Sequence, residues 1–173
     1  MLNRTWPTIA AVAVLLAGAG IAAPSTPRLV WNATASAPEG LYGLHHTDAL
    51  QLGQMVAVRP PPALAAWLDA RDYAPSGVLL VKQVAALPPS LVCRDGARVT
   101  IDRVLAADAR PADRWGRALP VWRGCRRLGP QDVFLLNGAP GSLDSRYLGP
   151  LPRGSVVGVL SPLWLLHGAW DGV

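Results

Sequence analysis

Short apolar runs separated by glycine, proline and aspartate characterise the chain from residue 31 onward. β-Branched residues are frequent in these runs, and each run is about as long as a strand. Turn-forming residues separate them at close spacing, which is typical of a small β-barrel. The pattern therefore predicts a mainly β, barrel-like domain. The predicted strands are residues 55–59, 78–87, 90–94, 98–105, 133–137 and 156–160.

Two segments depart from the strand pattern. Residues 63–73 have apolar positions at helical spacing, with Leu64, Trp67 and Leu68 on one narrow stripe, and a Pro-Ser-Gly turn follows them. This spacing predicts a short helical insertion. Residues 108–124 are rich in arginine and follow no regular apolar period, which predicts a surface loop.

The N-terminal segment is apolar over a much longer stretch. Residues 5–27 carry no charge, and a helix of about 20 apolar residues is long enough to span a bilayer. Trp6 and Trp31 flank the segment as interfacial aromatic residues do. The basic residue before it and the small residues within it also suit a cleavable signal sequence. We favour a membrane anchor at residues 1–30, followed by one domain at residues 31–173.

Composition and charge narrow the class of protein. With 51% hydrophobic and 16% charged residues, the chain can bury a core and is not disordered. Its net charge of +5 would suit a protein that binds nucleic acid. However, the arginines are scattered and no aromatic-basic motif is present, so we expect no nucleic-acid partner. A basic face against anionic lipid head groups suits an anchored protein better.

Cys93 and Cys125 are the two cysteines of the chain. In a domain that faces an oxidising compartment we expect them to form a disulfide, whereas in a reducing cytoplasm they would remain two thiols. Their spacing does not suit a metal site, and the adjacent residues His45 and His46 cannot readily bind one ion together. We therefore expect neither a metal nor another cofactor.

Ser36 lies in a turn-forming stretch, residues 31–43, that can present its hydroxyl to a cleft. Small residues flank it, Pro38 restricts the backbone two residues later, and Gly40 and Gly43 permit sharp turns. Such a setting suits a nucleophile, but it is also common in solvated turns. A catalytic role therefore requires a partner that activates the hydroxyl.

The candidate partner is Lys82. The 16 basic residues comprise fifteen arginines and this one lysine, which lies in an apolar run. Strand alternation places it on the face of Val78, Leu80 and Val84. Burial there disfavours the ammonium form, and lysine can lose its proton whereas arginine effectively cannot. The position suits a general base, although a lysine that extends to solvent from an edge strand is the alternative.

Three sequence blocks resemble the membrane-bound serine-lysine signal peptidases, and most closely the branch that processes pilin precursors for conjugative transfer. They are residues 32–42, residues 79–84 and Ser142-Leu143-Asp144-Ser145-Arg146-Tyr147-Leu148-Gly149-Pro150, in the order found in the family. General signal peptidases have methionine where Ala37 stands, and Gly-Asp-Asn-Arg where Asn137-Gly138-Ala139-Pro140 stands. These departures favour the specialised branch.

The resemblance implies a β-barrel fold shared with self-cleaving repressors, and catalysis through an acyl-enzyme. It also implies a role for each matched residue. These roles are nucleophile for Ser36, general base for Lys82, oxyanion donor for Thr34, lysine-orienting partner for Ser142, and either a catalytic or a structural charge pair for Asp144 and Arg146.

The resemblance further implies a membrane-associated precursor protein as the substrate and a catalytic domain on the periplasmic side of the bacterial inner membrane. For some pilin products it implies cyclisation by the substrate's own N-terminal amine. Two alternatives remain. One is a non-catalytic, membrane-tethered periplasmic binding or assembly module. The other is a self-cleaving serine-lysine regulator, which would need a DNA-binding segment before Ser36.

Overall fold

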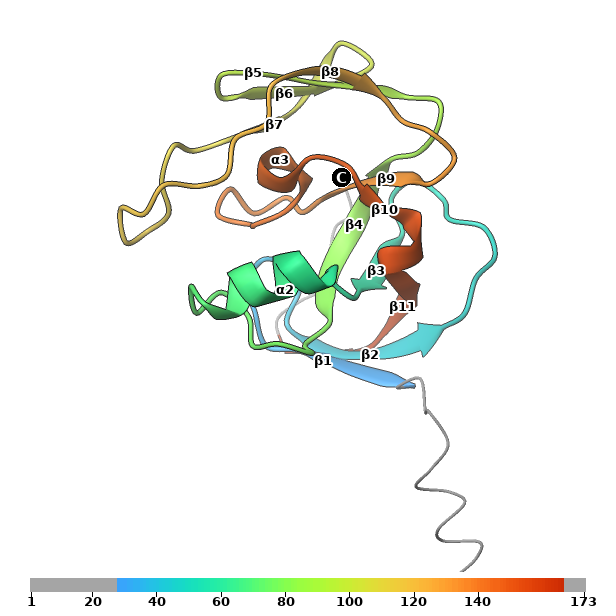
Figure 1. The fold of residues 1–173 in the computed structure, drawn as a ribbon. Helices are drawn as coiled ribbons and strands as arrows, with labels where there is room; N and C mark the ends of the chain where they lie inside the picture. The colour runs from blue at the N-terminus through green and yellow to red at the C-terminus, as the bar shows by residue number, and fades with distance from the viewer. Residues whose placement is uncertain (1–27, 167–173) are drawn as a thin grey trace, which may run out of the picture.

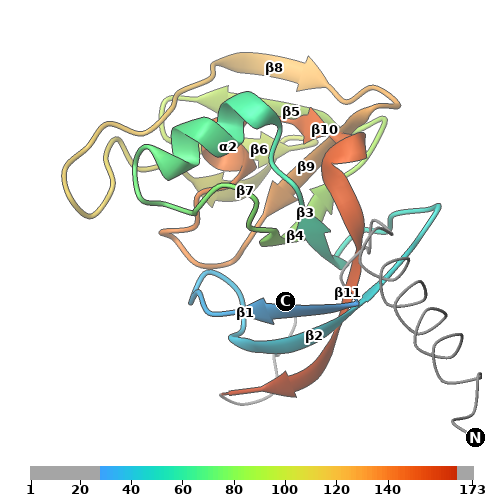
Figure 2. The same cartoon turned by 60° about the horizontal axis from the view of Figure 1, so that its bottom comes forward.

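The computed structural model describes residues 28–166, which form two antiparallel sheets. The larger sheet has the strand order β1-β2-β11-β3-β4-β9-β10, and the smaller has the order β7-β6-β5-β8. In Figures 1 and 2 the smaller sheet lies at one end of the molecule and β1 and β2 lie at the other; in Figure 1 helix α2 is drawn between them. The elements are β1 (Leu29–Asn32), β2 (Gly40–His45), β3 (Met55–Val58), α2 (Pro62–Asp69), β4 (Leu80–Ala86), β5 (Leu91–Asp95), β6 (Arg98–Ile101), β7 (Val104–Asp108), β8 (Gly124–Arg127), β9 (Asp132–Leu136), α3 (Ser145–Leu148), β10 (Leu151–Pro152), the 3-10 turn η1 (Arg153–Ser155) and β11 (Val156–Leu165).

Strands β3, β4 and β9 form the centre of the larger sheet. All four residues of β3 are buried, and β9 is buried from Val133 to Leu136. Phe134 of β9 clusters with Val92 and Val99, so the same strand also supports the smaller sheet. A fully buried side chain of this size contributes about 1.5–3 kcal/mol to folding. Lys82 therefore lies on a strand that is held firmly on both sides.

Strand β11 joins the two parts of the larger sheet because it pairs with both β2 and β3. It crosses β2 closely at Gly40, where a Cβ atom would collide with the carbonyl oxygen of Trp164. Gly40 also has a φ of +155°, a conformation that other residues rarely adopt. This glycine fixes the path of the chain shortly after Ser36.

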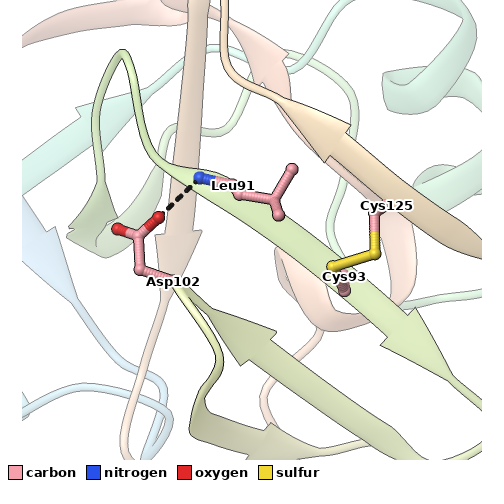
Figure 3. The surroundings of a disulfide bond; sticks show 4 residues. All are labelled: Leu91, Cys93, Asp102 and Cys125. Carbon is pink, nitrogen blue, oxygen red and sulfur yellow. Dashed lines mark hydrogen bonds between the residues drawn. A yellow bond between two sulfur atoms is a disulfide. The ribbon is translucent and has the colours of Figure 1, made fainter.

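The single strand predicted for residues 98–105 is wrong, because the chain forms β6 and β7 there. It reverses direction at Asp102 and Arg103, whose φ angles are 49° and 72°. The Asp102 carboxylate accepts a hydrogen bond of 2.8 Å from the backbone N–H of Leu91, as Figure 3 shows. Aspartate tolerates this left-handed conformation, but no glycine or proline marks the turn in the sequence.

Other predicted elements agree with the structure apart from their ends. The strands predicted at 55–59, 78–87, 90–94, 133–137 and 156–160 correspond to β3, β4, β5, β9 and the first half of β11. The helix predicted at 63–73 ends earlier, at Asp69. The sequence pattern does not predict β1, β2, β8, β10 or α3, since these elements are short or contain glycine, proline or charged residues.

Cys93 and Cys125 are directly opposite each other on β5 and β8 and form a disulfide, shown in Figure 3. The disulfide ties the exposed edge strand β8 to its neighbour. Residues 109–123, between β7 and β8, contain one isolated bridge from Ala112 to Ala118 and otherwise follow the predicted loop.

The predicted membrane anchor falls almost entirely on residues 1–27, which lie outside the described residues. Leu29 and Val30, at its predicted end, belong to β1. Within residues 28–166, no helix is both long and apolar enough to cross a membrane.

Candidate active site

The turn that carries Ser36 is organised by the buried side chain of Asn32, the last residue of β1. The Asn32 Nδ2 group donates to the carbonyl oxygens of Thr34, Ala37 and Pro38, each at 3.0 Å. Its Oδ1 accepts from the Thr34 backbone N–H at 3.2 Å and from the Thr34 hydroxyl at 2.8 Å. One amide thus holds both ends of the turn and fixes its backbone conformation.

The Ser36 hydroxyl lies 3.3 Å from the Thr34 hydroxyl. Because the Thr34 hydroxyl donates its hydrogen to Asn32, it accepts from Ser36 in this arrangement. Ser36 is half-buried, and its immediate neighbour Ala37 packs into the core. Its oxygen is therefore held in place but remains accessible.

Lys82 lies at the middle of β4 and is 6% exposed. Its Nζ donates to the Ser142 hydroxyl at 3.0 Å, and Ser142 is itself 1% exposed. Burial lowers the pKa of Lys82 from 10.5 to about 8; the Asp144 carboxylate opposes this shift and the Arg146 guanidinium adds to it. About a tenth of the Lys82 amine is therefore neutral at pH 7, far more than for a lysine with the ordinary pKa.

Ser36, Lys82 and Ser142 all line one cleft of about 630 Å³. No hydrogen bond joins Ser36 to Lys82 in the described part of the chain. Catalytic hydrogen bonds are often long before substrate binds, so this geometry is compatible with a nucleophile and its base. The cleft brings together two residues that lie far apart in the sequence.

The outer wall of the cleft joins the segment after α2 to the 109–123 loop. The Tyr73 hydroxyl donates to the Asp113 carboxylate at 2.5 Å, and Arg117 Nε donates to the same oxygen at 2.7 Å. Arg117 also lies over the rings of Tyr73 and Trp115. These contacts hold the loop beside the cleft.

Asp144 and Arg146 form a buried ion pair of 2.8 Å behind the cleft. The Asp144 carboxylate also caps α3 by accepting from the Arg146 backbone N–H. Both side chains bind the backbone of Asn137: Asp144 Oδ2 accepts from its N–H at 3.1 Å, and Arg146 donates to its carbonyl oxygen at 2.6 Å. The pair thus fixes the end of β9 next to β4.

Asn32 and Asn137 have no role predicted from the sequence, although both are buried beside the site. Each is a polar residue at the end of a short apolar run, in Leu-Val-Trp-Asn and in Val-Phe-Leu-Leu-Asn. This pattern is a usable signal, because a buried amide must find hydrogen-bond partners. The residues predicted for the site, Thr34, Ser36, Lys82, Ser142, Asp144 and Arg146, all lie in or directly behind the cleft.

The fold and the cleft are those of a mainly β protein with a serine and a buried lysine in one pocket. The family model described as signal peptidase, peptidase S26, matches residues 3–164. The chain therefore belongs to the peptidase S26 signal peptidase family, as the resemblance indicated.

Several relatives are proteins of conjugal transfer. The chain is 34% identical over 145 residues to the conjugal transfer protein TraF of Agrobacterium fabrum, covering 77% of this chain and 80% of the relative. It is 32% identical over 163 residues to the plasmid transfer protein TraF of Escherichia coli, covering 87% and 88%. A crystal structure of a signal peptidase I from Enterococcus faecalis matches with a TM-score of 0.39 and 19% identity, over 66% of this chain and 98% of that one.

Proposed function

We propose that the chain is a membrane-anchored serine endopeptidase that cleaves a secreted precursor protein through Ser36 and Lys82. The observation that carries the proposal is the buried Lys82 amine, held by Ser142 in the same cleft as the accessible Ser36 hydroxyl. Membership of a peptidase family supports the reaction class. A lysine in this setting is suited to accept a proton from a serine hydroxyl.

The proposed reaction begins when Ser36 Oγ attacks a peptide carbonyl carbon and neutral Lys82 accepts the hydroxyl proton. The backbone N–H of Ser36 and the Thr34 hydroxyl stabilise the oxyanion. To donate a hydrogen bond to the oxyanion, the Thr34 hydroxyl must give up its hydrogen bond to Asn32 Oδ1, which requires only rotation of the hydroxyl group. Lys82 then returns the proton to the leaving amine as the C–N bond breaks, and an acyl-enzyme remains on Ser36.

Water completes the reaction by attacking the ester carbonyl carbon while Lys82 accepts one of its protons. Lys82 then gives that proton to Ser36 Oγ as the ester C–O bond breaks, which releases the carboxylic acid product and restores the enzyme. Alternatively, the N-terminal amine of the substrate attacks the ester in place of water, which would produce a circular chain without net uptake of water. That route requires a high effective concentration of the amine at the ester, and membrane confinement of both proteins favours it. Hydrolysis is the default because water is always present.

The proposed substrate is a pilin precursor. Relatives named as conjugal transfer proteins support this assignment. The test is co-expression of the chain with a candidate precursor, followed by mass analysis of the product. We expect a shortened pilin: an open product weighs one water more than a circular one and has a free N-terminus. An unprocessed precursor in every co-expression would support the non-catalytic module instead.

The rate of cleavage should depend on pH through Lys82. Because burial lowers the pKa of Lys82 to about 8, the neutral form required for proton abstraction increases up to that pH and then saturates. We expect kcat/KM to rise about tenfold per pH unit well below pH 8 and to reach a plateau above it. A peptide assay between pH 6 and pH 10 measures this. A profile that falls between pH 7 and pH 9 would argue against Lys82 as the base.

We also propose that the domain lies against the bilayer, with its cleft on the periplasmic side. Apolar side chains on β1 and at the end of β11 are about half exposed, and the rings of Trp31 and Trp164 lie 6.0 Å apart. These strands lie at the end of the molecule opposite the smaller sheet (Figures 1 and 2). Such a patch is suited to lipid contact. Its members are Leu29, Trp31, Leu163, Trp164 and Leu166.

The disulfide supports the periplasmic placement, because disulfides persist in oxidising compartments. We expect Cys93 and Cys125 to be joined in protein isolated from cells after thiols are blocked by alkylation. Replacing both by alanine should lower the free energy of unfolding by about 3–4 kcal/mol, since the crosslink closes a loop with a sequence separation of 32. Mass analysis and denaturant unfolding measure the two effects. Two alkylated thiols in the untreated chain would contradict the placement.

A further inference from the structure

The end of β9 does not continue the backbone pairing with β4. Leu136 is the last residue of β9 and is opposite Gln83. Beyond it, the Asn137 side chain bonds to β4 in place of the backbone. Its Oδ1 accepts from the Gln83 backbone N–H, and its Nδ2 donates to the Val81 carbonyl oxygen, both at 3.1 Å.

These two peptide groups lie on either side of Lys82. Lys82 itself is paired with Val56 of β3, on the opposite edge of β4. The backbone around the lysine is therefore bound from both neighbours, by β3 on one side and by a single side-chain amide on the other. We propose that Asn137 is a positioning residue, which holds the β4 backbone so that the Lys82 amine reaches Ser142 and the cleft.

The buried ion pair acts through this amide. Asp144 and Arg146 bind the N–H and the carbonyl of Asn137, so that the amide can bridge both β4 groups at once. Neither side chain donates to or accepts from the Lys82 amine. Their part in the proposed reaction is therefore to orient Asn137, in addition to the opposing electrostatic effects that they have on Lys82.

Removal of the amide has a defined physical consequence. Asn137→Ala leaves the buried Val81 carbonyl and the partly buried Gln83 N–H without hydrogen-bond partners, and such groups require water. Water beside β4 hydrates the Lys82 amine and favours its ammonium form. Asp144 and Arg146, the charged groups that act on Lys82, are unchanged in this variant. We therefore expect the pKa of Lys82 to rise from about 8 toward 10.5.

Because Lys82 is the single lysine of the chain, its pKa can be measured directly. Lysine labelled with ¹³C at Cε gives one side-chain resonance, from Lys82, in the full chain in detergent micelles. Its titration is compared in the wild type, in Asn137→Ala and in a control, Gln131→Ala, which removes an exposed amide. We expect a rise of at least one pKa unit in Asn137→Ala and no change in the control. Asn137→Ser, which keeps one polar group, replaces Asn137→Ala if the alanine variant does not fold.

Kinetics provide the second measurement, and they rest on the proposed function. Asn137→Ala should lower kcat at pH 7 at least tenfold with little change in KM, and part of this loss should be recovered at pH 10. Unchanged titration of Lys82 in a folded Asn137→Ala or Asn137→Ser chain would overturn the positioning role, whatever its activity. If the wild type cleaves no precursor, the proposed function fails, but the Lys82 titration still decides the role of Asn137.

Discussion

Ser36→Ala is expected to reduce precursor cleavage by about 10⁴-fold or more, because it removes the oxygen that forms the acyl-enzyme. The change deletes one oxygen from a half-buried side chain, and among the described residues the only side-chain hydrogen bond of that oxygen is to Thr34. The turn around it is held by Asn32 and does not depend on the serine oxygen. Cleavage of a co-expressed precursor, followed by mass analysis, measures the effect.

Thermal unfolding separates lost chemistry from lost structure in this variant. Ser36→Ala should unfold within a few degrees of the wild type, since no core contact is removed. Ser161→Ala is a matched control, because it removes an exposed hydroxyl from β11 and should cleave at the normal rate. Cleavage by Ser36→Ala at more than about a tenth of the wild-type rate would eliminate Ser36 as the nucleophile.

Lys82→Met is expected to abolish cleavage and at the same time to stabilise the protein. Methionine fills a similar volume without an amine to accept the serine proton. The unfolded state binds a proton at Lys82 below pH 10.5, whereas the folded state binds it only below about pH 8. Folding stability is therefore lost as pH falls between these values and is lower by about 3 kcal/mol below pH 8.

Lys82→Met should raise the free energy of unfolding by about 2 kcal/mol at pH 7. The increase is smaller than about 3 kcal/mol because the Ser142 hydroxyl loses its hydrogen bond to Lys82. The gain should disappear as pH rises above 10. Denaturant unfolding at several pH values measures it. A variant that is less stable than the wild type at pH 7 would contradict the buried, destabilised state of the lysine.

Lys82→Arg is the control that keeps the positive charge. Arginine cannot lose its proton at any pH of the assay, so we expect no cleavage and no gain in stability. Normal processing by Lys82→Arg would reject the serine-lysine mechanism regardless of the results for the other variants.

Local sequence pattern was sufficient to predict the central strands and to place Lys82 within one of them, but it left open whether the lysine is buried or extends to solvent, and the structure shows that it is buried. Strand alternation depends only on neighbouring residues, and the run from Leu80 to Ala86 is apolar apart from Lys82 and Gln83. The three blocks of the family also placed every predicted site residue at or behind the cleft. The sequence pattern did not predict the turn at Asp102, which carries no glycine or proline. It also did not predict β1 and β8, which are short and combine apolar with polar residues or glycine.

The sequence by itself therefore determined the central strands, the lysine within one of them, and the family. Only the tertiary structure decided what holds the lysine: Ser142 lies 60 positions from Lys82 in the chain, and Asn137 lies 56 positions from Val81. These contacts depend on the register of β4 against β9 and on the path of the loop before α3. Local periodicity contains no information on either, because register is set by packing between strands that are distant in sequence.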